Sequence, residues 1–499
     1  MASTTLPSVE DGASQQDLAE KAQDDNKASD ADEGSKPPDV SGWDWNKDPQ
    51  NPYNWPARAK AWQIAITALI ALLASLGTSI MSSAPAQLKA EFGVTTTQSI
   101  LPLSLYVFAL ALGPVVGGPL SETVGRLPIY LGGLIGGGLF TLGAALVHNF
   151  AGLNILRFLA GLFFAPSLAI GAGTINEMYH PQHRGLPTTI FVLMPFLGPG
   201  IAPIMGAFIT QRKGWRWTQW TMLFFLALCL LLLVPLGRET YHPILQRRRA
   251  AQLHLPLPPK PRRRNQAKEF LTTTVLRPLL MIVTEPIVGL ICLYVSCEFA
   301  TLFTFFAAVP YIFEGVYGFT SEQSGLVFVS VVVGCALGAI TIVLCEVFLY
   351  RPQIPRHPPH MVPPEYRLYP AMLGSLGLPV ALFWMAWTSR VEVHWISPVL
   401  SIVPFAWGNL CVFISLVTFT VDTYSGSVVA SAVAANSLTR YGLAGAFPLF
   451  TIQMYNKLGI AWATSLLGFI SIALLPVPWV FFKYGKKIRS FSHYETPTY

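Results

Sequence analysis

Twelve long apolar runs constrain the fold of this chain more than any other feature of the sequence. Each run has 18 or more residues and is long enough for a helix to cross roughly 30 Å of hydrocarbon. The runs cover residues 62–83, 99–119, 128–147, 152–174, 187–210, 219–236, 287–311, 323–346, 370–388, 396–420, 428–452 and 459–482. Backbone amides in lipid must pair within their own segment, and the alternation of barrel strands is absent. The sequence therefore predicts an all-α membrane protein with twelve transmembrane helices.

The composition agrees with this prediction and argues against a cytosolic enzyme. Charged residues make up only 12% of the chain, whereas a soluble domain averages about 25%. All six cysteines lie inside the apolar runs: Cys229, Cys292, Cys297, Cys335, Cys345 and Cys411. This placement indicates neither a disulfide framework nor a metal site. We expect no bound metal and no cofactor.

The charges are distributed unevenly, and their distribution predicts the domains. Residues 1–54 carry 12 acidic and 4 basic side chains and few large apolar ones, so we expect a disordered acidic tail. Residues 237–280 form a basic, proline-rich linker with six spans on either side. The predicted domains are thus a six-helix bundle over 55–236, a second over 281–482, and a tail over 483–499.

Lysine and arginine also predict the orientation. With the amino terminus inside, Arg58 and Lys60, the cytoplasmic connections and the tail after residue 482 together collect 21 of these residues, and the opposite side collects 6. The positive-inside rule therefore places both termini in the cytoplasm. The net charge of +7 reflects this topology, and we expect no nucleic-acid partner.

A glycine-rich motif connects the second and third runs. Residues 117–126 read GGPLSETVGR, which predicts a tight cytoplasmic turn. Gly118, Glu122, Gly125 and Arg126 are candidate latch residues, because the acid and the arginine can pair with helix ends of the other half in one conformation and release them in another. The alternative is a glycine-rich turn with unrelated charges.

The fifth run contains a regular series of prolines. Pro195, Pro199 and Pro203 are four residues apart, and Gly198 and Gly206 lie beside them. This spacing predicts a kinked helix with a face of small residues that permits close packing and bending. The alternative is a kinked helix with a purely structural role.

Three charged residues lie well inside the apolar runs: Arg157, Glu298 and Arg440. A charge at mid-bilayer costs from about 2.5 to over 10 kcal/mol, so such residues face the bundle interior or water and usually serve transport. Glu298 has Tyr294 one helical turn before it and could load and release a proton. The alternative is a glutamate permanently paired with an arginine.

At this point the chain resembles a known family, the twelve-span fungal drug:proton antiporters of the major facilitator superfamily. The likeness covers residues 43–495. The matching motifs are DPQNP at 48–52, GPLSE at 118–122 with Gly125 and Arg126, RFLAG at 157–161, PFLGP at 195–199, EPIV at 285–288, PEYRL at 364–368 and AAN at 434–436. The resemblance implies two six-helix bundles around a central cavity that opens alternately to each side, usually for proton-driven efflux across the plasma membrane.

The resemblance also bears on the two buried arginines. Members of the family keep an arginine at the position of Arg440, which here has Asn436 one turn before it. The resemblance therefore implies that Arg440 either forms a structural ion pair or anchors a carboxylate. It implies that Arg157 lies beside the proton pathway, and a buried hydrogen-bond hub is the alternative. Two arginines against one glutamate favour an anionic or neutral cargo over a polyamine.

The chain departs from the family pattern at three places. Leu127 replaces a second basic residue after the turn, and Ala202 and Ala207 replace glycines in the fifth run. Many relatives have a glutamate at the position of Ala307, whereas the acid here is Glu298, two turns earlier. The last difference makes the relatives' substrates a poor guide to the cargo.

We therefore expect an efflux carrier that exchanges a small organic molecule for protons, with a drug-like compound, a secondary metabolite or an organic acid as cargo. A proton symporter for uptake is the alternative within the same fold. A membrane enzyme or receptor is the rival class, but the nine histidines form no catalytic set. The expected partners are the substrate, protons and the bilayer, and the protein is expected to be a monomer in the plasma membrane.

Overall fold

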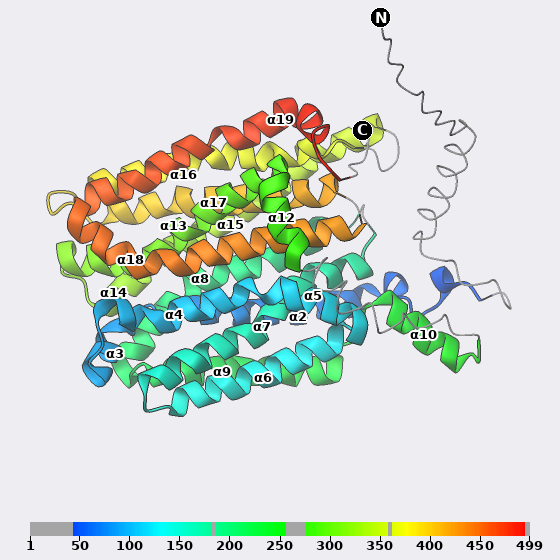
Figure 1. The fold of residues 1–499 in the computed structure, drawn as a ribbon, viewed down its shortest axis with the longest axis horizontal. Helices are drawn as coiled ribbons and strands as arrows, with labels where there is room; N and C mark the ends of the chain where they lie inside the picture. The colour runs from blue at the N-terminus through cyan, green and yellow to red at the C-terminus, as the bar shows by residue number, and fades with distance from the viewer. Residues whose placement is uncertain are drawn as a thin grey trace, which may run out of the picture.

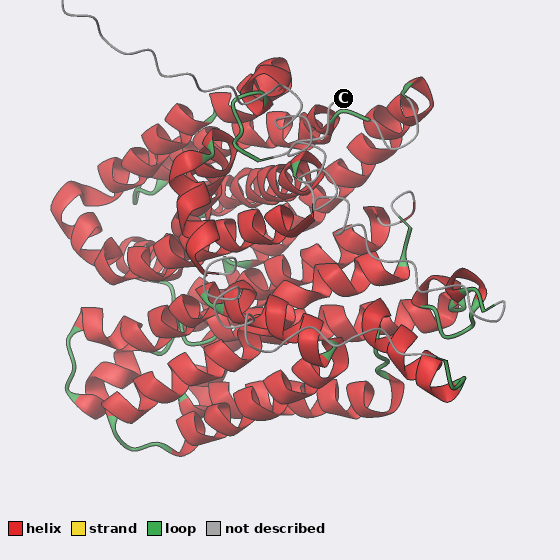
Figure 2. Ribbon diagram, turned by 45° about the vertical axis from the view of Figure 1, so that its right-hand side comes forward, coloured by secondary structure: helices red, strands yellow, loops and turns green. Residues whose placement is uncertain are grey.

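The computed structural model describes residues 43–180, 183, 185–255, 275–357, 362–424 and 426–494. Every regular element in these ranges is a helix (Figure 2). The predictions for most of the acidic tail, for the middle of the basic linker and for the last five residues lie outside the described residues.

The long helices agree with the predicted spans. They are α2 (Ala57–Ser79), α4 (Thr96–Ala111), α6 (Arg126–Leu146), α7 (Phe150–Met178), α8 (Gly185–Lys213), α9 (Arg216–Leu236), α13 (Pro286–Tyr317), α15 (Val329–Cys345), α16 (Tyr369–Thr388), α17 (Ile396–Thr423) and α18 (Gly426–Leu474). The shorter helices are α3 (Pro85–Phe92), α5 (Gly113–Val124), α10 (His242–Gln252), α12 (Arg277–Thr284), α14 (Ser321–Leu326) and α19 (Pro476–Arg489). Hydropathy and length mark 11 membrane-spanning segments among the described residues.

The last of these segments contains two crossings. It runs from Val428 to Arg489 over 62 residues, about three times the length that one crossing needs. The chain breaks at Gly459, whose φ of 74° and ψ of 163° are not helical. The predicted twelve spans are therefore confirmed.

The helices form two groups that lie side by side (Figure 1). In the first, α2 packs against α8 and α7 against α4 and α6; in the second, α13 packs against α18 and α17 against α15 and α16. The groups meet where α4 contacts α18 and where α8 contacts α14 and α15. Helices α3 and α14 lie at one end of the molecule, and α10 and the carboxyl end of α19 lie at the other.

Residues 43–54, which the sequence assigns to the tail, are folded in the structure. They form short 3-10 helices at Trp45–Lys47 and Pro52–Asn54. The buried Asp48 carboxylate accepts hydrogen bonds from Trp43 Nε1 and from Arg249 Nε in α10, both at 2.9 Å. Burial alone would raise the pKa of Asp48, but these hydrogen bonds lower it below its ordinary value. The folded part of the chain thus begins before residue 55.

The prolines of α8 expose a carbonyl that a neighbouring helix satisfies. Pro199 has no N–H, so the carbonyl of Pro195 loses its usual donor four residues later. The hydroxyl of Ser75 in α2 donates to this oxygen at 2.5 Å instead. The missing helical bond in α8 therefore becomes a bond between two helices.

The glycines of α8 bring the same two helices into close contact. A Cβ atom at Gly198 would lie 3.0 Å from the backbone carbon of Ser75, and one at Gly206 would lie 3.1 Å from that of Ile80. Both positions are therefore closed to larger residues unless α2 moves. Pro203 lies between them on α8, and its carbonyl is 3.2 Å from where a Cβ of Gly325 in α14 would be. Helix α8 thus packs closely against α2 on one face and against α14 of the second bundle on another face.

Candidate functional site

An arginine surrounded by aromatic rings lies where the two halves meet. Arg440 is in the middle of the first part of α18 and is partly buried. Its guanidinium carbon lies 4.6 Å from the ring centre of Phe299, 4.7 Å from that of Phe413 and 4.3 Å from that of Tyr441. These distances are within the range of cation–π attraction.

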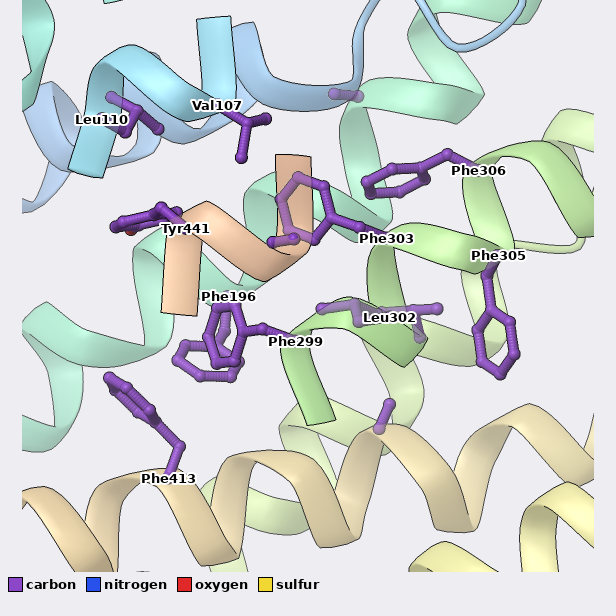
Figure 3. Close-up of a cluster of buried hydrophobic side chains, with 14 of the residues drawn as sticks. Val107, Leu110, Phe196, Phe299, Leu302, Phe303, Phe305, Phe306, Phe413 and Tyr441 are labelled. Atoms are coloured by element: carbon purple, nitrogen blue, oxygen red, sulfur yellow. The ribbon is translucent and has the colours of Figure 1, made fainter. Parts of the chain in front are cut away.

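The rings come from both halves of the molecule (Figure 3). Phe196 in α8 packs against Phe413 with ring centres 4.9 Å apart and against Phe299 at 5.4 Å. We call Phe196, Phe299, Phe413, Tyr441 and Arg440 the central cluster. Its only ring from the first half, Phe196, connects the cluster to the kinked helix.

Several polar groups at or near this cluster have no partner among the described residues. Nε of Arg440 and Oδ1 of Asn436, one turn earlier on α18, make no hydrogen bond. Both amide atoms of Asn409, one turn before Phe413 on α17, are also without a partner. None of the ion pairs between described residues involves Arg440. The cluster therefore contains a cation without an anion.

Glu298 lies in a different place, inside the second bundle. It borders a cavity of about 10 Å³ between α13, α16, α17 and the last part of α18, close to the smallest space that can hold one water molecule. Glu298 is 4% exposed, and neither carboxylate oxygen has a partner among the described residues. The hydroxyls of Tyr294 and Ser471, which also line the cavity, are equally without partners.

Glu298 and the central cluster lie on different faces of α13. Tyr294, Cys297, Glu298 and Thr301 line the cavity, and their spacing places them on one helix face. Phe299 is one residue further, which rotates it by about 100° toward the other half. The sequence brought Glu298 and Arg440 together as mid-membrane charges, but the structure gives each its own surroundings. No arginine pairs with Glu298 in the described part of the chain.

Arg157 is bonded within the first bundle. Its Nη2 donates to the carbonyl of Gly77 at 2.5 Å, in the last turn of α2, and its Nε donates to the carbonyl of Pro102 in α4 at 3.3 Å. Its guanidinium lies 4.4 Å from the ring centre of Tyr106. The carbonyl of Gly77 lies in the last turn of α2, where carbonyls lack helical donors, and Arg157 supplies one. Through its two hydrogen bonds Arg157 connects α7 to α2 and to α4. These contacts are those of the hydrogen-bond hub.

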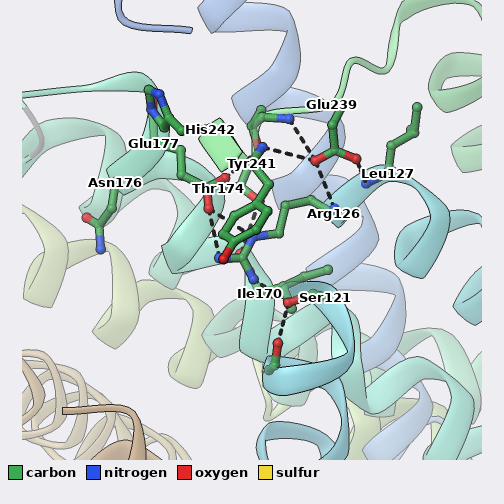
Figure 4. A network of polar contacts seen from close by, with 12 residues as sticks. Ser121, Arg126, Leu127, Ile170, Thr174, Asn176, Glu177, Glu239, Tyr241 and His242 are labelled. Carbon is green, nitrogen blue, oxygen red and sulfur yellow. Dashed lines mark hydrogen bonds and ion pairs between the residues drawn. The ribbon is translucent and has the colours of Figure 1, made fainter. Parts of the chain in front are cut away.

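Arg126 forms a polar network at the end of the molecule where α10 lies (Figure 4). Its Nε and Nη2 donate to Oε1 of Glu177 in α7 at 3.0 and 2.8 Å, and its Nη1 donates to Ser121. Thr240 Oγ1 donates to the other oxygen of Glu177 at 2.7 Å. These partners all belong to the first half, so in this conformation Arg126 is bonded within its own bundle.

Glu239 completes the network from the connection after α9. Its carboxylate accepts the backbone N–H groups of Arg126 at 2.9 Å and Leu127 at 3.1 Å, at the start of α6. It also accepts those of Thr240 and Tyr241 at 3.1 and 3.0 Å. A glutamate distant in sequence therefore caps α6. Sequence reasoning missed both Glu177 and Glu239, although acids at span ends on the same predicted side as Arg126 were a usable signal.

The predicted turn over 117–126 is shorter in the structure. Helix α5 continues through Gly118 and Glu122 to Val124, and the chain turns only at Gly125, where φ is 108°. A glycine inside a helix costs only about 0.5–1 kcal/mol relative to alanine, so the glycines of this motif do not end α5, and the predicted loop was too long. Glu122 is exposed and is not among the residues that bond Arg126.

At the opposite end, side chains join the two halves. Arg212 at the end of α8 forms an ion pair with Glu322 of α14 at 2.7 Å. Thr97 in α4 and Gln453 in α18 are also hydrogen bonded. The end that the sequence assigns to the exterior is therefore held together across the interface in this conformation.

Comparison with known proteins agrees with this architecture. The family model described as Major Facilitator Superfamily matches residues 67–448. The chain is 38% identical to Polyamine transporter 4 of Saccharomyces cerevisiae, over 95% of this chain and 76% of that protein. It is 35% identical to MFS-type transporter traF of Penicillium crustosum, over 94% of this chain and 97% of that protein.

Two further comparisons extend the likeness. Efflux pump FUB11 of Gibberella moniliformis is 36% identical over 87% of this chain and 74% of its own length. The crystal structure of a D-xylose-proton symporter superposes with a TM-score of 0.61 at 16% identity, covering 84% of this chain and 97% of the symporter. The fold, the motifs and these matches agree, and the chain belongs to the Major Facilitator Superfamily, in its group of fungal drug:proton antiporters.

Proposed function

We propose that this protein exports a small organic molecule in exchange for protons. Its family makes it a multi-pass membrane transporter and not an enzyme. The names of several relatives, among them Efflux pump FUB11, support efflux as the direction. A drug-like compound, a secondary metabolite or an organic acid is the proposed cargo.

The partnerless carboxyl of Glu298 carries the proposal for proton coupling. An ionised carboxylate without a partner at mid-bilayer is unfavourable by about 2.5 kcal/mol or more. In the present conformation the protonated form is therefore favoured, and release of the proton requires a rearrangement that brings water or a cation to the cavity. The cavity is lined by two other titratable side chains, Tyr294 and Cys297, and by no lysine, arginine or histidine.

Helix α13 provides the connection between proton and cargo. Glu298 faces the cavity, and Phe299, the next residue, contacts the central cluster between the halves. A shift of α13 that admits water to Glu298 also moves Phe299 against Phe196 and Arg440. Alternating access needs such a coupling between protonation and the interface of the two bundles.

The network of Arg126 is the proposed latch at the cytoplasmic end. In this conformation Arg126, Glu177 and Glu239 join α6, α7 and the connection after α9. We propose that Gly118, Glu122 and Gly125 belong to the same latch and that α8, with its prolines, bends during the exchange.

We also propose the arrangement of the protein in the cell. Bundles over 55–236 and 281–482 flank a cytoplasmic linker over 237–280, and both termini face the cytoplasm. The charge distribution along the sequence supports this orientation. The protein acts as a monomer in the plasma membrane, with its substrate and protons as partners and no nucleic acid.

Flux measurements with Glu298→Gln test the proposal. Compounds whose export depends on the protein are first identified by comparing the medium of cells with and without it. In proteoliposomes a pH gradient should drive accumulation of such a compound by the wild type. Glu298→Gln should abolish the response to the gradient and retain exchange of compound for compound, because glutamine preserves the volume but binds no proton.

Glu314→Gln is the matched control. Glu314 lies on the same helix but is exposed near its end, where it accepts a hydrogen bond from Ser321 at 3.1 Å. This variant should respond to the gradient like the wild type. An unchanged gradient response in Glu298→Gln would exclude Glu298 from coupling, and accumulation along the direction of proton entry would contradict antiport.

A further inference from the structure

We propose that the central cluster binds an aromatic anion, such as a planar aromatic carboxylate, and selects it over neutral and cationic compounds. The binding group is Arg440, and the rings of Phe196, Phe299 and Phe413 hold the aromatic part. The inference rests on the proposed function because it names the class of cargo, and it is tested by binding alone.

The charge of Arg440 is not neutralised by a described residue. Arg157, the other arginine in the middle part of a predicted span, donates to backbone carbonyls of α2 and α4. Arg440 instead has a side-chain hydrogen bond with Tyr441 and aromatic ring faces at 4.3 to 4.7 Å, which attract a cation but carry no negative charge. Its Nε has no acceptor. A carboxylate fits the guanidinium edge with two parallel hydrogen bonds, which is the strongest pairing this group makes.

The partnerless amide atoms, both of Asn409 and the oxygen of Asn436, add polar capacity for the ligand. Asn436 lies one turn from Arg440 on α18, and Asn409 lies one turn from Phe413 on α17, so each is next to a member of the cluster. Asn409 is 1% exposed and Asn436 is 6% exposed. Buried amides of this kind are normally hydrogen bonded. A ligand with a hydroxyl beside its carboxylate could donate to Oδ1 of Asn436, and its oxygen atoms could accept from Nδ2 of Asn409.

The aromatic rings determine the shape of the ligand. Phe196 lies 4.9 Å from Phe413 and 5.4 Å from Phe299, measured between ring centres. Aromatic rings attract one another at these separations. A planar aromatic ligand that enters between Phe196 and the other two rings would replace a contact between two phenylalanines by contacts of each phenylalanine with the ligand. Because Phe196 belongs to the first half and the other rings to the second, a ligand between them touches both bundles.

The cluster also disfavours a cationic ligand. Aromatic boxes commonly bind cations, but here Arg440 already fills the box with the chain's own positive charge. A second cation would be repelled by this charge in a partly buried site. We therefore expect this protein to differ in cargo from its relative named Polyamine transporter 4, to which it is 38% identical.

Binding of three matched probes tests the inference. The full chain in nanodiscs is titrated with 1-naphthoate, 1-naphthamide and 1-naphthylmethylammonium, and affinity is followed by ligand-induced shifts of the melting temperature. The carboxylate should bind roughly tenfold or more tightly than the amide, since a hydrogen bond to a charged group is worth this factor or more. The ammonium compound should bind most weakly.

Arg440→Gln should remove the preference for the carboxylate and leave the affinity for the amide within about twofold. The control is Arg390→Gln, since Arg390 also lies over an aromatic ring, that of Trp387 at 5.4 Å, but is exposed. It should retain the full preference. Phe413→Leu should weaken the carboxylate and the amide together, and it gives a second measurement if Arg440→Gln does not fold.

Equal binding of naphthoate and naphthamide by the wild type, or no binding of either, would overturn the inference without any variant. A preference that survives in Arg440→Gln would also overturn it. The measurement needs no proton gradient, so it fails independently of the proposed function. Gradient-driven flux by a protein without carboxylate preference would refute this inference alone, whereas carboxylate preference without gradient-driven flux would refute only proton antiport.

Discussion

Substitution of Gly125 by alanine should destabilise the first bundle, for reasons that the structure makes quantitative. Gly125 has φ of 108° and ψ of 165°, a conformation that is essentially confined to glycine. A Cβ atom there would also press on the carboxylate of Glu239 and would lie 3.3 Å from Cδ1 of Ile244. This carboxylate caps the start of α6. One methyl group therefore strains the turn and displaces the cap.

The two effects can be added approximately. Holding a non-glycine residue in this backbone region costs about 1–3 kcal/mol. Loss of a helix cap costs about 0.5–2 kcal/mol. Gly125→Ala should then lower the free energy of unfolding by roughly 2–4 kcal/mol, allowing for relief by movement of Glu239. For a domain of this size, such a loss lowers the melting temperature by about 4 °C or more.

Gly118→Ala is the matched control from the same motif. Gly118 lies inside α5 with ordinary helical geometry, and a Cβ atom there would have no atom within 4 Å. Alanine should therefore be neutral or stabilise the helix by about 0.5–1 kcal/mol. Thermal unfolding of the detergent-solubilised protein, followed by size-exclusion chromatography, compares the two. Wild-type melting of Gly125→Ala, or an equal loss in both variants, would refute the reasoning.

Two further predictions concern the end of the molecule near α3 and α14. Glu322→Gln removes the ion pair with Arg212, whose side chain is 65% exposed, so the melting temperature should hardly change. Spin labels on α3 and α14 should nevertheless report a larger population of separated halves. An unchanged distance distribution would argue against a role of this pair in closure. Glu91 accepts hydrogen bonds from Arg216, which lower its pKa below the ordinary value of 4.5. The stabilisation by ionised Glu91 is therefore full above about pH 4.5 and is lost as the pH falls through the lower pKa of the folded state. Glu91→Gln should flatten this decline in melting temperature at acidic pH. A decline identical to that of the wild type would contradict the assignment.

The spans could be predicted because the bilayer imposes a length that hydropathy reports directly. The ends of the predicted runs and of the helices differ by a few residues, and even the break at Gly459 coincides with the predicted start of the last span. Local packing is less visible in sequence. Residues 43–54 have the composition of a tail, but Asp48 finds Arg249 in α10 across about two hundred residues. Charge counts cannot reveal such a distant partner.

The site was only partly predictable because residue type does not determine a partner. Glu239 lies in a stretch that hydropathy assigns to a linker, and its role as a cap depends on Gly125 in another part of the chain. Glu298 and Phe299 are neighbours in sequence, and the helical rotation of about 100° between them separates the proton site from the central cluster. The helical period alone predicts that Glu298 and Phe299 lie on different faces of α13, so this separation could have been predicted from the sequence.

The two membrane arginines show why such residues need their surroundings before they acquire a role. Arg157 and Arg440 are both arginines within predicted spans, and the sequence alone leaves two alternatives open for each of them. Arg157 is bonded to the carbonyls of Gly77 and Pro102, which compensate its charge within one bundle. Arg440 contacts ring faces that leave an edge without an acceptor. Arg157 is thus satisfied by its own bundle, and this difference in surroundings is why we propose Arg440, and not Arg157, as the group that binds the ligand.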